Sequence, residues 1–268
     1  MNPLLKHRLR IAVGWFGLRF RETLPLHASK SEFCRHLKAL GFEPEWVIDV
    51  GVADGTLDIY TNFPKARYLL VEPMSEFSGA LRWISEHYRA DVEPVAAGGS
   101  ESTLTIHYSP QLADMHGATL AESSNSEAAS NSRNVAVRRL DALAREHKIA
   151  GTILLKIDTQ GTELQVLDGA SGILDQVEVA ILEVSLFNFG LKQPVLHEVV
   201  SYMAERGFVA YDMFDGWGRP LDGALGQVDI AFVKENGRFR RDQRYAEPSK
   251  RKSPVLRAMN WMRHILKV

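Results

Sequence analysis

The chain has a single cysteine, Cys34, among its 268 residues. One cysteine excludes an internal disulfide and any metal cluster built from cysteine ligands, and such a composition is typical of a reducing compartment. No two histidines have the His-x-x-x-His spacing of zinc enzymes. These absences leave carboxylates as the main candidates for chemistry, and the identity of any metal stays unknown.

Long apolar runs are lacking as well. The apolar stretch near the N-terminus, residues 11–18, is far too short to span a bilayer. Arg19 and Arg21 follow it, without the small residues of a signal-peptide cleavage site. We therefore expect a cytoplasmic protein.

The chain also lacks a large net charge, but its charge is unevenly distributed. The total is −1, whereas residues 1–30 carry +5 and residues 238–268 carry +8, so the body between them is acidic. Enzymes that act on nucleic acid spread basic charge around the cleft, and we expect no nucleic-acid partner. The basic ends, including an amphipathic stretch at 255–268, leave peripheral membrane contact, packing on the acidic body and a homo-oligomer open.

Residues 46–72 follow the pattern of a nucleotide-binding unit. A β-branched strand at 46–50 leads into a loop at 51–55, and a second apolar strand ends at Glu72. Glu72 lies 23 residues after Asp49, where doubly wound folds place an acid on the ribose hydroxyls.

The loop itself favours S-adenosylmethionine over a dinucleotide. It reads G-V-A-D-G and lacks the G-x-G-x-x-G fingerprint. Asp49, Asp54 and Asp58 would repel a pyrophosphate, whereas S-adenosylmethionine carries a positive sulfonium. Gly51 permits a sharp turn and Gly55 permits close approach of a ligand. A nicotinamide-dependent enzyme remains an alternative.

Strand and helix patterns alternate along the body of the chain, which predicts a mostly parallel sheet covered on both faces. No crossover helix fits between the last two strands, so we expect them to pair antiparallel. The predicted helices are 29–40, 55–62, 76–89, 138–147, 162–170 and 195–206, and the predicted strands are 46–50, 67–71, 92–96, 102–108, 152–157, 177–183, 207–212 and 227–233.

Three regions are expected on this basis. They are a basic helical extension at 1–45, the α/β domain at 46–237 and a basic tail at 238–268. Within the domain, the Ser- and Asn-rich segment 114–134 is either a lid over the site or a plain surface loop.

A second motif lies at 153–170. A buried strand leads to Asp158, Gly161 makes the turn, and Thr162 is placed to cap the next helix. Lys156 is expected to pair with an acid in the sheet. Because ligands bind at the carboxyl ends of parallel strands, five carboxylates are expected to converge on one rim: Asp49, Glu72, Asp158, Glu183 and Asp212.

Together these segments resemble the FkbM family of S-adenosylmethionine-dependent methyltransferases. The family pattern D-V-G-A-N-x-G, E-P, L-D-x-L, L-K-I-D-x-E-G-x-E-x-x-V-L-x-G-A corresponds here to segments at 49–55, 72–73, 140–143 and 155–170, followed by the acidic strand end Glu183. Asp54 replaces the usual Asn and Gln160 replaces the usual Glu.

The resemblance implies a class I, Rossmann-like methyltransferase: a three-layer sandwich around a seven-stranded, mostly parallel sheet with an antiparallel last strand. It also implies methyl transfer to a hydroxyl oxygen, often of a glycan or secondary metabolite. A non-catalytic S-adenosylmethionine-binding or interaction protein of the same fold is the alternative, and Gln160 is its only support.

Site roles follow from this interpretation. Asp49, Gly51, Asp54 and Gly55 would hold the donor, Glu72 its ribose, and the small residue Ala97 would leave room for adenine.

Several side chains are candidates for the catalytic group. Asp158 is the first candidate for general base, or for a Mg²⁺ ligand together with Glu183; its alternative role is scaffolding. His116 and His107 are further candidate bases.

Overall fold

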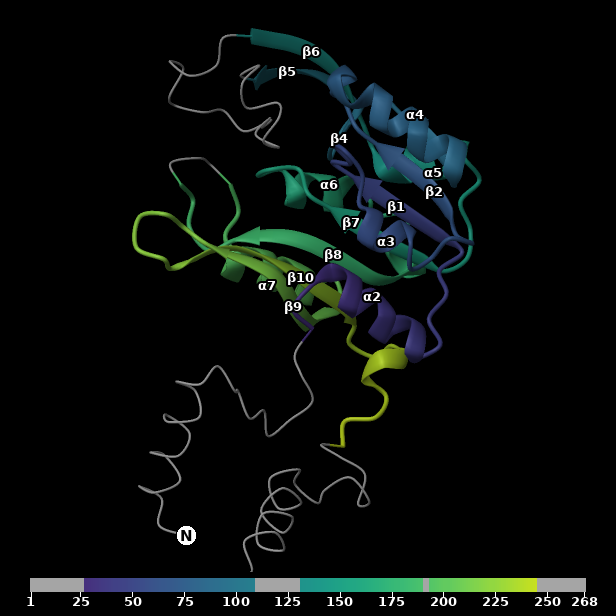
Figure 1. The fold of residues 1–268 in the computed structure, drawn as a ribbon, viewed down its shortest axis with the longest axis vertical. Coiled ribbons are helices and arrows are strands. Elements are labelled where there is room, and N and C mark those ends of the chain that lie inside the picture. The colour runs from purple at the N-terminus through teal and green to yellow at the C-terminus, as the bar shows by residue number, and fades with distance from the viewer. Residues whose placement is uncertain (1–26, 109–130, 190–192, 245–268) are drawn as a thin grey trace, which may run out of the picture. The chain divides into compact units, whose positions relative to one another are not determined.

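A seven-stranded sheet with the order β3-β2-β1-β7-β8-β10-β9 organises the chain in this computed structural model, which describes residues 27–108, 131–189 and 193–244 (Figure 1). Residues 27–241 form one compact unit. The strands of this sheet are β1 (Trp46–Val50), β2 (Arg67–Val71), β3 (Arg89–Glu93), β7 (Ile153–Ile157), β8 (Val177–Ser185), β9 (Phe208–Gly218) and β10 (Leu225–Lys234).

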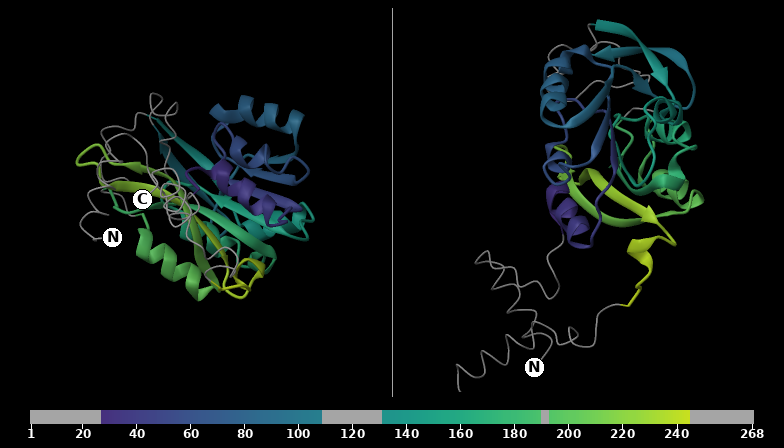
Figure 2. Two further views of the ribbon diagram at one scale, coloured as in Figure 1. Left: turned by 60° about the horizontal axis from the view of Figure 1, so that its bottom comes forward. Right: turned by 90° about the vertical axis from the view of Figure 1, so that its right-hand side faces the viewer.

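Helices cover both faces of the sheet (Figure 2). One apolar cluster packs α2, α3 and α4 against one face, and a second packs α5, α6 and α7 against the other. The helices are α2 (Lys30–Ala39), α3 (Leu57–Tyr60), α4 (Ser78–His87), α5 (Leu140–Glu146), α6 (Glu163–Gly169) and α7 (Leu196–Glu205), with short 3₁₀ turns η1 (Ser75–Phe77), η3 (Leu174–Gln176) and η4 (Arg238–Arg240). None of these helices has the length and apolar character needed to cross a bilayer.

The central strands are parallel and buried along their whole length. Every residue of β1 and β7 is buried, as expected for strands with neighbours on both sides and helices above and below. β10 lies antiparallel between β8 and β9. This arrangement confirms the expected fold class, a class I methyltransferase sandwich.

A small second sheet, β4-β6-β5, flanks the main one. It consists of β4 (Ala96–Ala97), β5 (Ser102–Tyr108) and β6 (Asn131–Arg138). The strand at 131–138 was not predicted, and residues 131–134 of the expected lid belong to it. The rest of that segment lies outside the described residues.

One predicted strand is displaced. The expected strand 92–96 is observed at 89–93, because Tyr88 already has an extended backbone and ends α4 early. Pro94 has no N–H to donate to a ladder, which is consistent with the strand ending before it.

Helix α2 is held to the sheet by an aromatic contact. Its N-cap Ser29 accepts a hydrogen bond from the Glu32 amide. The fully buried ring of Phe33 stacks on Phe214 of β9, with ring centroids 4.9 Å apart. This contact fixes the N-terminal end of α2 near the carboxyl ends of the strands.

We expect Phe33→Ala to lower the free energy of unfolding by about 3–5 kcal/mol, because it removes a buried ring and leaves a cavity. The measurement is urea denaturation of the full chain. Arg35→Ala, on the exposed side of the same helix, is the matched control and should stay within about 0.5 kcal/mol of wild type. Equal stabilities for the two variants would contradict this role of Phe33.

Candidate functional site

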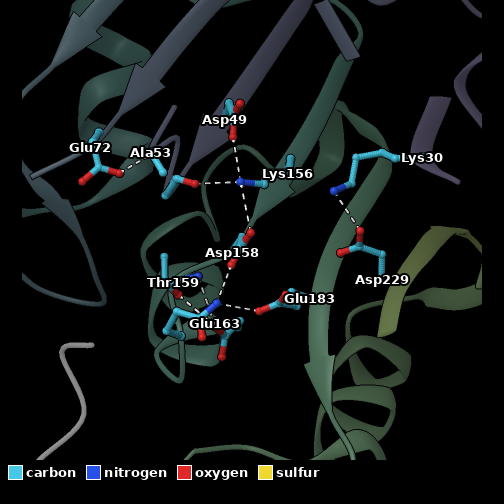
Figure 3. A network of polar contacts seen from close by, with 12 residues as sticks. Lys30, Asp49, Ala53, Glu72, Lys156, Asp158, Thr159, Glu163, Glu183 and Asp229 are labelled. Atoms are coloured by element: carbon cyan, nitrogen blue, oxygen red, sulfur yellow. Dashed lines mark hydrogen bonds and ion pairs between the residues drawn. The ribbon is translucent and has the colours of Figure 1, made fainter. Parts of the chain in front are cut away.

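Polar side chains gather on the α2–α3 face of the sheet, at the carboxyl ends of its strands (Figure 3). Asp49 of β1 is the register partner of Lys156 of β7, and Glu183 of β8 is the partner of Asp229 of β10. Register partners point to the same face of a sheet. Asp158 follows β7 directly, between these two pairs.

The deepest element of the site is an ion pair between β1 and β7. Lys156 Nζ lies 3.2 Å from Asp49 Oδ1 and 3.5 Å from Asp158 Oδ2, and it donates a 2.7 Å hydrogen bond to the Gly51 carbonyl. The Tyr60 hydroxyl donates to the other oxygen of Asp49. Burial acts to lower the pKa of Lys156, but Asp49 and Asp158 outweigh it and raise that pKa. The expectation that Lys156 pairs with an acid is confirmed.

This arrangement places the Asp49 side chain behind the site. The carboxylate is 0% exposed and faces Lys156 and Tyr60, whereas the nearby hollow is lined by the loop that follows. Asp49 therefore supports that loop through Lys156 and the Gly51 carbonyl.

A hollow of about 490 Å³ lies beside the loop after β1. Gly51 has φ +72°, and a Cβ there would lie 1.8 Å from the Asp158 carbonyl oxygen, so only glycine fits. Gly55 has φ +103° and faces Ile84. The hollow is lined by Lys30, Gly51, Val52, Ala53, Asp54, Gly55, Thr56, Leu57, Asp58, Thr61, Lys156 and Asp158.

Glu72 ends β2 on the other side of the same loop. Its Oε2 accepts a 3.0 Å hydrogen bond from the Ala53 amide, and its Oε1 accepts a 2.9 Å bond from the Met74 amide. Burial raises the pKa of this carboxyl, although the two amides act against it. Each oxygen keeps a second lone pair, so the group can still accept hydroxyl donors.

The side chains of Asp158 and Glu183 form a carboxyl pair, and Gln160 bridges them. The Gln160 amide donates to Asp158 Oδ1 at 3.0 Å and to Glu183 Oε2 at 2.7 Å. A glutamate at this position would offer no donor and would add a third negative charge. Gln160, which replaces the glutamate of the family pattern, therefore holds the two carboxyls together.

The two carboxyls differ in proton affinity. Burial and the charges of Asp158 and Asp229 raise the pKa of Glu183 to about 8. Burial also acts on Asp158, but Lys156 and the Gln160 amide outweigh it and lower the pKa of Asp158. The charge of Asp158 therefore favours the protonated form of Glu183.

Two further residues of the site were missed by the sequence analysis. Lys30, at the start of α2, forms a 2.8 Å ion pair with Asp229, and it lines the hollow. Burial acts to lower the pKa of Lys30, but Asp229 outweighs it and raises that pKa. The local sequence around Lys30 reads only as the first turn of a helix. The acidic position Asp229 inside an apolar strand was the one signal available.

The loop between Asp158 and α6 is held by Glu163, not by Thr162. Glu163 Oε1 accepts hydrogen bonds from the Gly161 amide at 2.9 Å and the Thr159 amide at 3.3 Å. Thr162 does occupy the N-cap position of α6, but its hydroxyl makes no capping hydrogen bond and is buried without a partner among the described residues. A carboxylate reaches the loop amides that the shorter hydroxyl cannot.

The remaining predicted residues lie apart from this cluster. Asp212 does not join the rim, because it pairs with His27 Nδ1 at 2.5 Å. Ala97 is buried in the apolar cluster of the opposite face. His116 lies outside the described residues, and His107 lies in β5. Within the described ranges, no group of three or more His, Cys, Asp or Glu side chains is arranged to hold a metal ion.

We expect Lys156→Met to lower the free energy of unfolding by about 3–5 kcal/mol, because it leaves the buried Asp49 charge uncompensated. The double variant Asp49→Asn with Lys156→Met should cost less than Lys156→Met alone. Urea denaturation measures both, and Lys65→Met on the exposed surface is the control. A double variant that is less stable than the single one would contradict the ion-pair description.

Comparisons with solved structures found methyltransferases at low identity. The N-methyltransferase NodS from Bradyrhizobium japonicum WM9 is 9% identical, with a TM-score of 0.45 over 76% of this chain and 94% of that one. An rRNA methylase from Streptococcus thermophilus is 9% identical, with a TM-score of 0.43 over 78% and 99%. Precorrin-6y C5,15-methyltransferase from Geobacter metallireducens GS-15 is 10% identical, with a TM-score of 0.40 over 80% and 94%.

A search among curated proteins found no match. The family comparison is more informative, because residues 49–210, more than half of the chain, match the methyltransferase FkbM domain. The match includes the β1 loop, Glu72 and the Asp158–Glu183 pair, whereas Lys30 and Asp229 lie outside it. The chain belongs to the FkbM family of S-adenosylmethionine-dependent methyltransferases.

Proposed function

We propose that this protein is an O-methyltransferase that moves a methyl group from S-adenosylmethionine to a hydroxyl of a small-molecule or glycan acceptor. The observation that carries the proposal is the Asp158–Glu183 pair. It supplies a proton acceptor, Glu183, whose pKa is raised to about 8, next to the loop expected to hold the donor. An alcohol is a weak nucleophile until its proton is accepted.

The residues on both sides of the loop fit the donor. Glu72 would accept hydrogen bonds from the ribose hydroxyls, since it keeps free lone pairs beside the Ala53 amide. Gly51, Asp54 and Gly55 line the hollow and would follow the donor backbone. Ala97 packs in the apolar cluster of the opposite face, so we do not assign it to the adenine. When bound, the donor supplies an electrophilic methyl group, which bonds to the acceptor oxygen as its bond to sulfur breaks.

The carboxyl pair handles the proton of the acceptor. Glu183 in its ionised form accepts the hydroxyl proton, because its pKa lies above that of Asp158. Gln160 and Gln227 both donate to Glu183 Oε2, at 2.7 and 3.2 Å, and so orient the carboxyl. Catalysis is otherwise a matter of positioning the two reactants.

Other expectations stay predictions. They are the cytoplasmic location, peripheral membrane contact through the basic ends, a homo-oligomer, a divalent metal and a catalytic role for His116. The absence of a nucleic-acid partner is also still a prediction.

We expect wild type to bind S-adenosylhomocysteine in calorimetric titration and Glu72→Ala to bind it at least about tenfold more weakly, because two charge-assisted hydrogen bonds are lost. Glu86→Ala, an exposed acid on α4, is the matched control and should bind like wild type. Failure of the folded wild-type protein to bind would overturn the donor assignment. Binding without methyl transfer to any hydroxylated acceptor would favour the non-catalytic alternative.

We expect the methyl-transfer rate to fall as the pH drops below about 8, because Glu183 is then protonated and cannot accept the hydroxyl proton. The side-chain carboxyl carbon of Glu183, assigned in the ¹³C NMR spectrum with Glu183→Gln, should titrate in the same range. Glu183→Gln should lower kcat by about 100-fold or more.

The variant Asp158→Asn tests how much the charge of Asp158 contributes to the pKa of Glu183. The variant removes one charge that raises the pKa of Glu183, so the rising limb of the pH profile should move to lower pH. Burial should still keep the pKa of Glu183 above that of an ordinary glutamate. An unchanged limb in Asp158→Asn, or a flat wild-type profile, would argue against the pair as proton acceptor.

A further inference from the structure

The segment that follows β8 lies at the same edge of the sheet as the turn between β9 and β10 (Figure 1), and both regions carry exposed aromatic side chains. Phe189 and Trp217 are 43% and 42% exposed, and their rings are nearly parallel, at 13° with centroids 6.1 Å apart. The Arg219 guanidinium lies 4.0 Å above the Phe187 ring. Together, Phe187, Phe189, Trp217 and Arg219 form an aromatic platform.

The indole of Trp217 packs against the backbone of β10 at Gly226. A Cβ at Gly226 would lie 3.0 Å from the Trp217 ring, so glycine allows the indole to lie close to β10. The β9–β10 register shifts between Leu225, Gln227 and Asp229, and such bulges redirect side chains near functional sites. The ring is therefore held in place by the hairpin.

The platform is joined to the proton acceptor by one side chain. Trp217 Nε1 donates to Gln227 Oε1 at 3.0 Å, and Gln227 Nε2 donates to Glu183 Oε2 at 3.2 Å. A ligand that covers the indole thus has an edge close to Gln227 and Glu183. Neither Trp217 nor Gln227 lies within the matched family segment 49–210.

The charge of the platform indicates a neutral ligand. Arg219 forms two hydrogen bonds to Asp222, at 2.8 and 2.5 Å, which neutralise its charge. An anion would therefore gain little electrostatic attraction there. Flat apolar surface beside amide and carboxyl groups matches a ring with one C–H face and a hydroxylated edge.

We propose that the aromatic platform is an acceptor subsite that binds the C–H face of an uncharged pyranose on Trp217 and Phe189 and presents one of its hydroxyls to Glu183. This proposal rests on the methyl transfer to a hydroxyl proposed above and names the acceptor class as a neutral sugar ring. Phe189 and Trp217 determine specificity, and Gln227 is a positioning residue between the sugar and Glu183.

The test uses the full chain with saturating S-adenosylhomocysteine. Saturation-transfer NMR with methyl glycosides of neutral sugars should show binding to wild type, with the strongest transfer to the ring C–H protons of one face. Trp217→Ala should weaken glycoside binding by about five- to tenfold, because a stacking contact is lost. Trp217→Phe should retain most of it.

The controls separate this proposal from the one on which it rests. Trp83→Ala removes an exposed tryptophan on α4 and should bind glycosides like wild type. All variants should keep the affinity for S-adenosylhomocysteine, which also shows that they are folded. If S-adenosylhomocysteine binds but no glycoside does, or if Trp217→Ala binds glycosides like wild type, the subsite is overturned while the donor site stands. Failure of S-adenosylhomocysteine to bind would instead overturn the proposed function.

Discussion

The buried contact between Asp49 and Lys156 is the interaction on which the rest of the site depends. It joins adjacent parallel strands at the point where both end, and its ammonium also holds the Gly51 carbonyl of the loop after β1. A charge buried in the sheet is tolerated only when an opposite charge compensates it. Each partner of the pair therefore fixes the position of the other. The loop that lines the hollow and the carboxyl end of β7 are therefore positioned by one group.

Around this pair, two lysines compensate three carboxylates of the site. Lys156 faces Asp49 and Asp158, and Lys30 compensates Asp229. Glu183 instead accepts hydrogen bonds from two neutral amides, those of Gln160 and Gln227. Burial and the nearby charges of Asp158 and Asp229 therefore raise the pKa of Glu183.

Local patterns were enough to predict the elements that carry the family motifs. The buried strands β1 and β7, the loop glycines and the antiparallel final strands follow from residue types at short range, and the structure confirms them. Strand β6 was missed because only Val135 and Val137 alternate as apolar residues, and its first residues are polar. The shift of β3 came from a helix end that depends on one backbone conformation at Tyr88.

The site was less accessible to sequence reasoning, because its missing members come from distant segments. Nothing near Lys30 shows that α2 packs with its first turn over Asp229, and nothing near Trp217 shows its link to Glu183. Conversely, Asp49 has the sequence position of a donor ligand but a fully buried side chain. Strand-end position indicates which residues meet at the rim, whereas packing decides which of them face the hollow.

The pairing of β5 with β6 has a consequence for how this chain can be altered. Tyr108 and Asn131 are register partners, so the two ends of the intervening segment are anchored next to each other. Doubling the length of a loop with fixed ends costs only about 0.6 kcal/mol in closure entropy. Insertions between these two residues should therefore leave the main sheet intact, which makes this position suitable for a reporter tag.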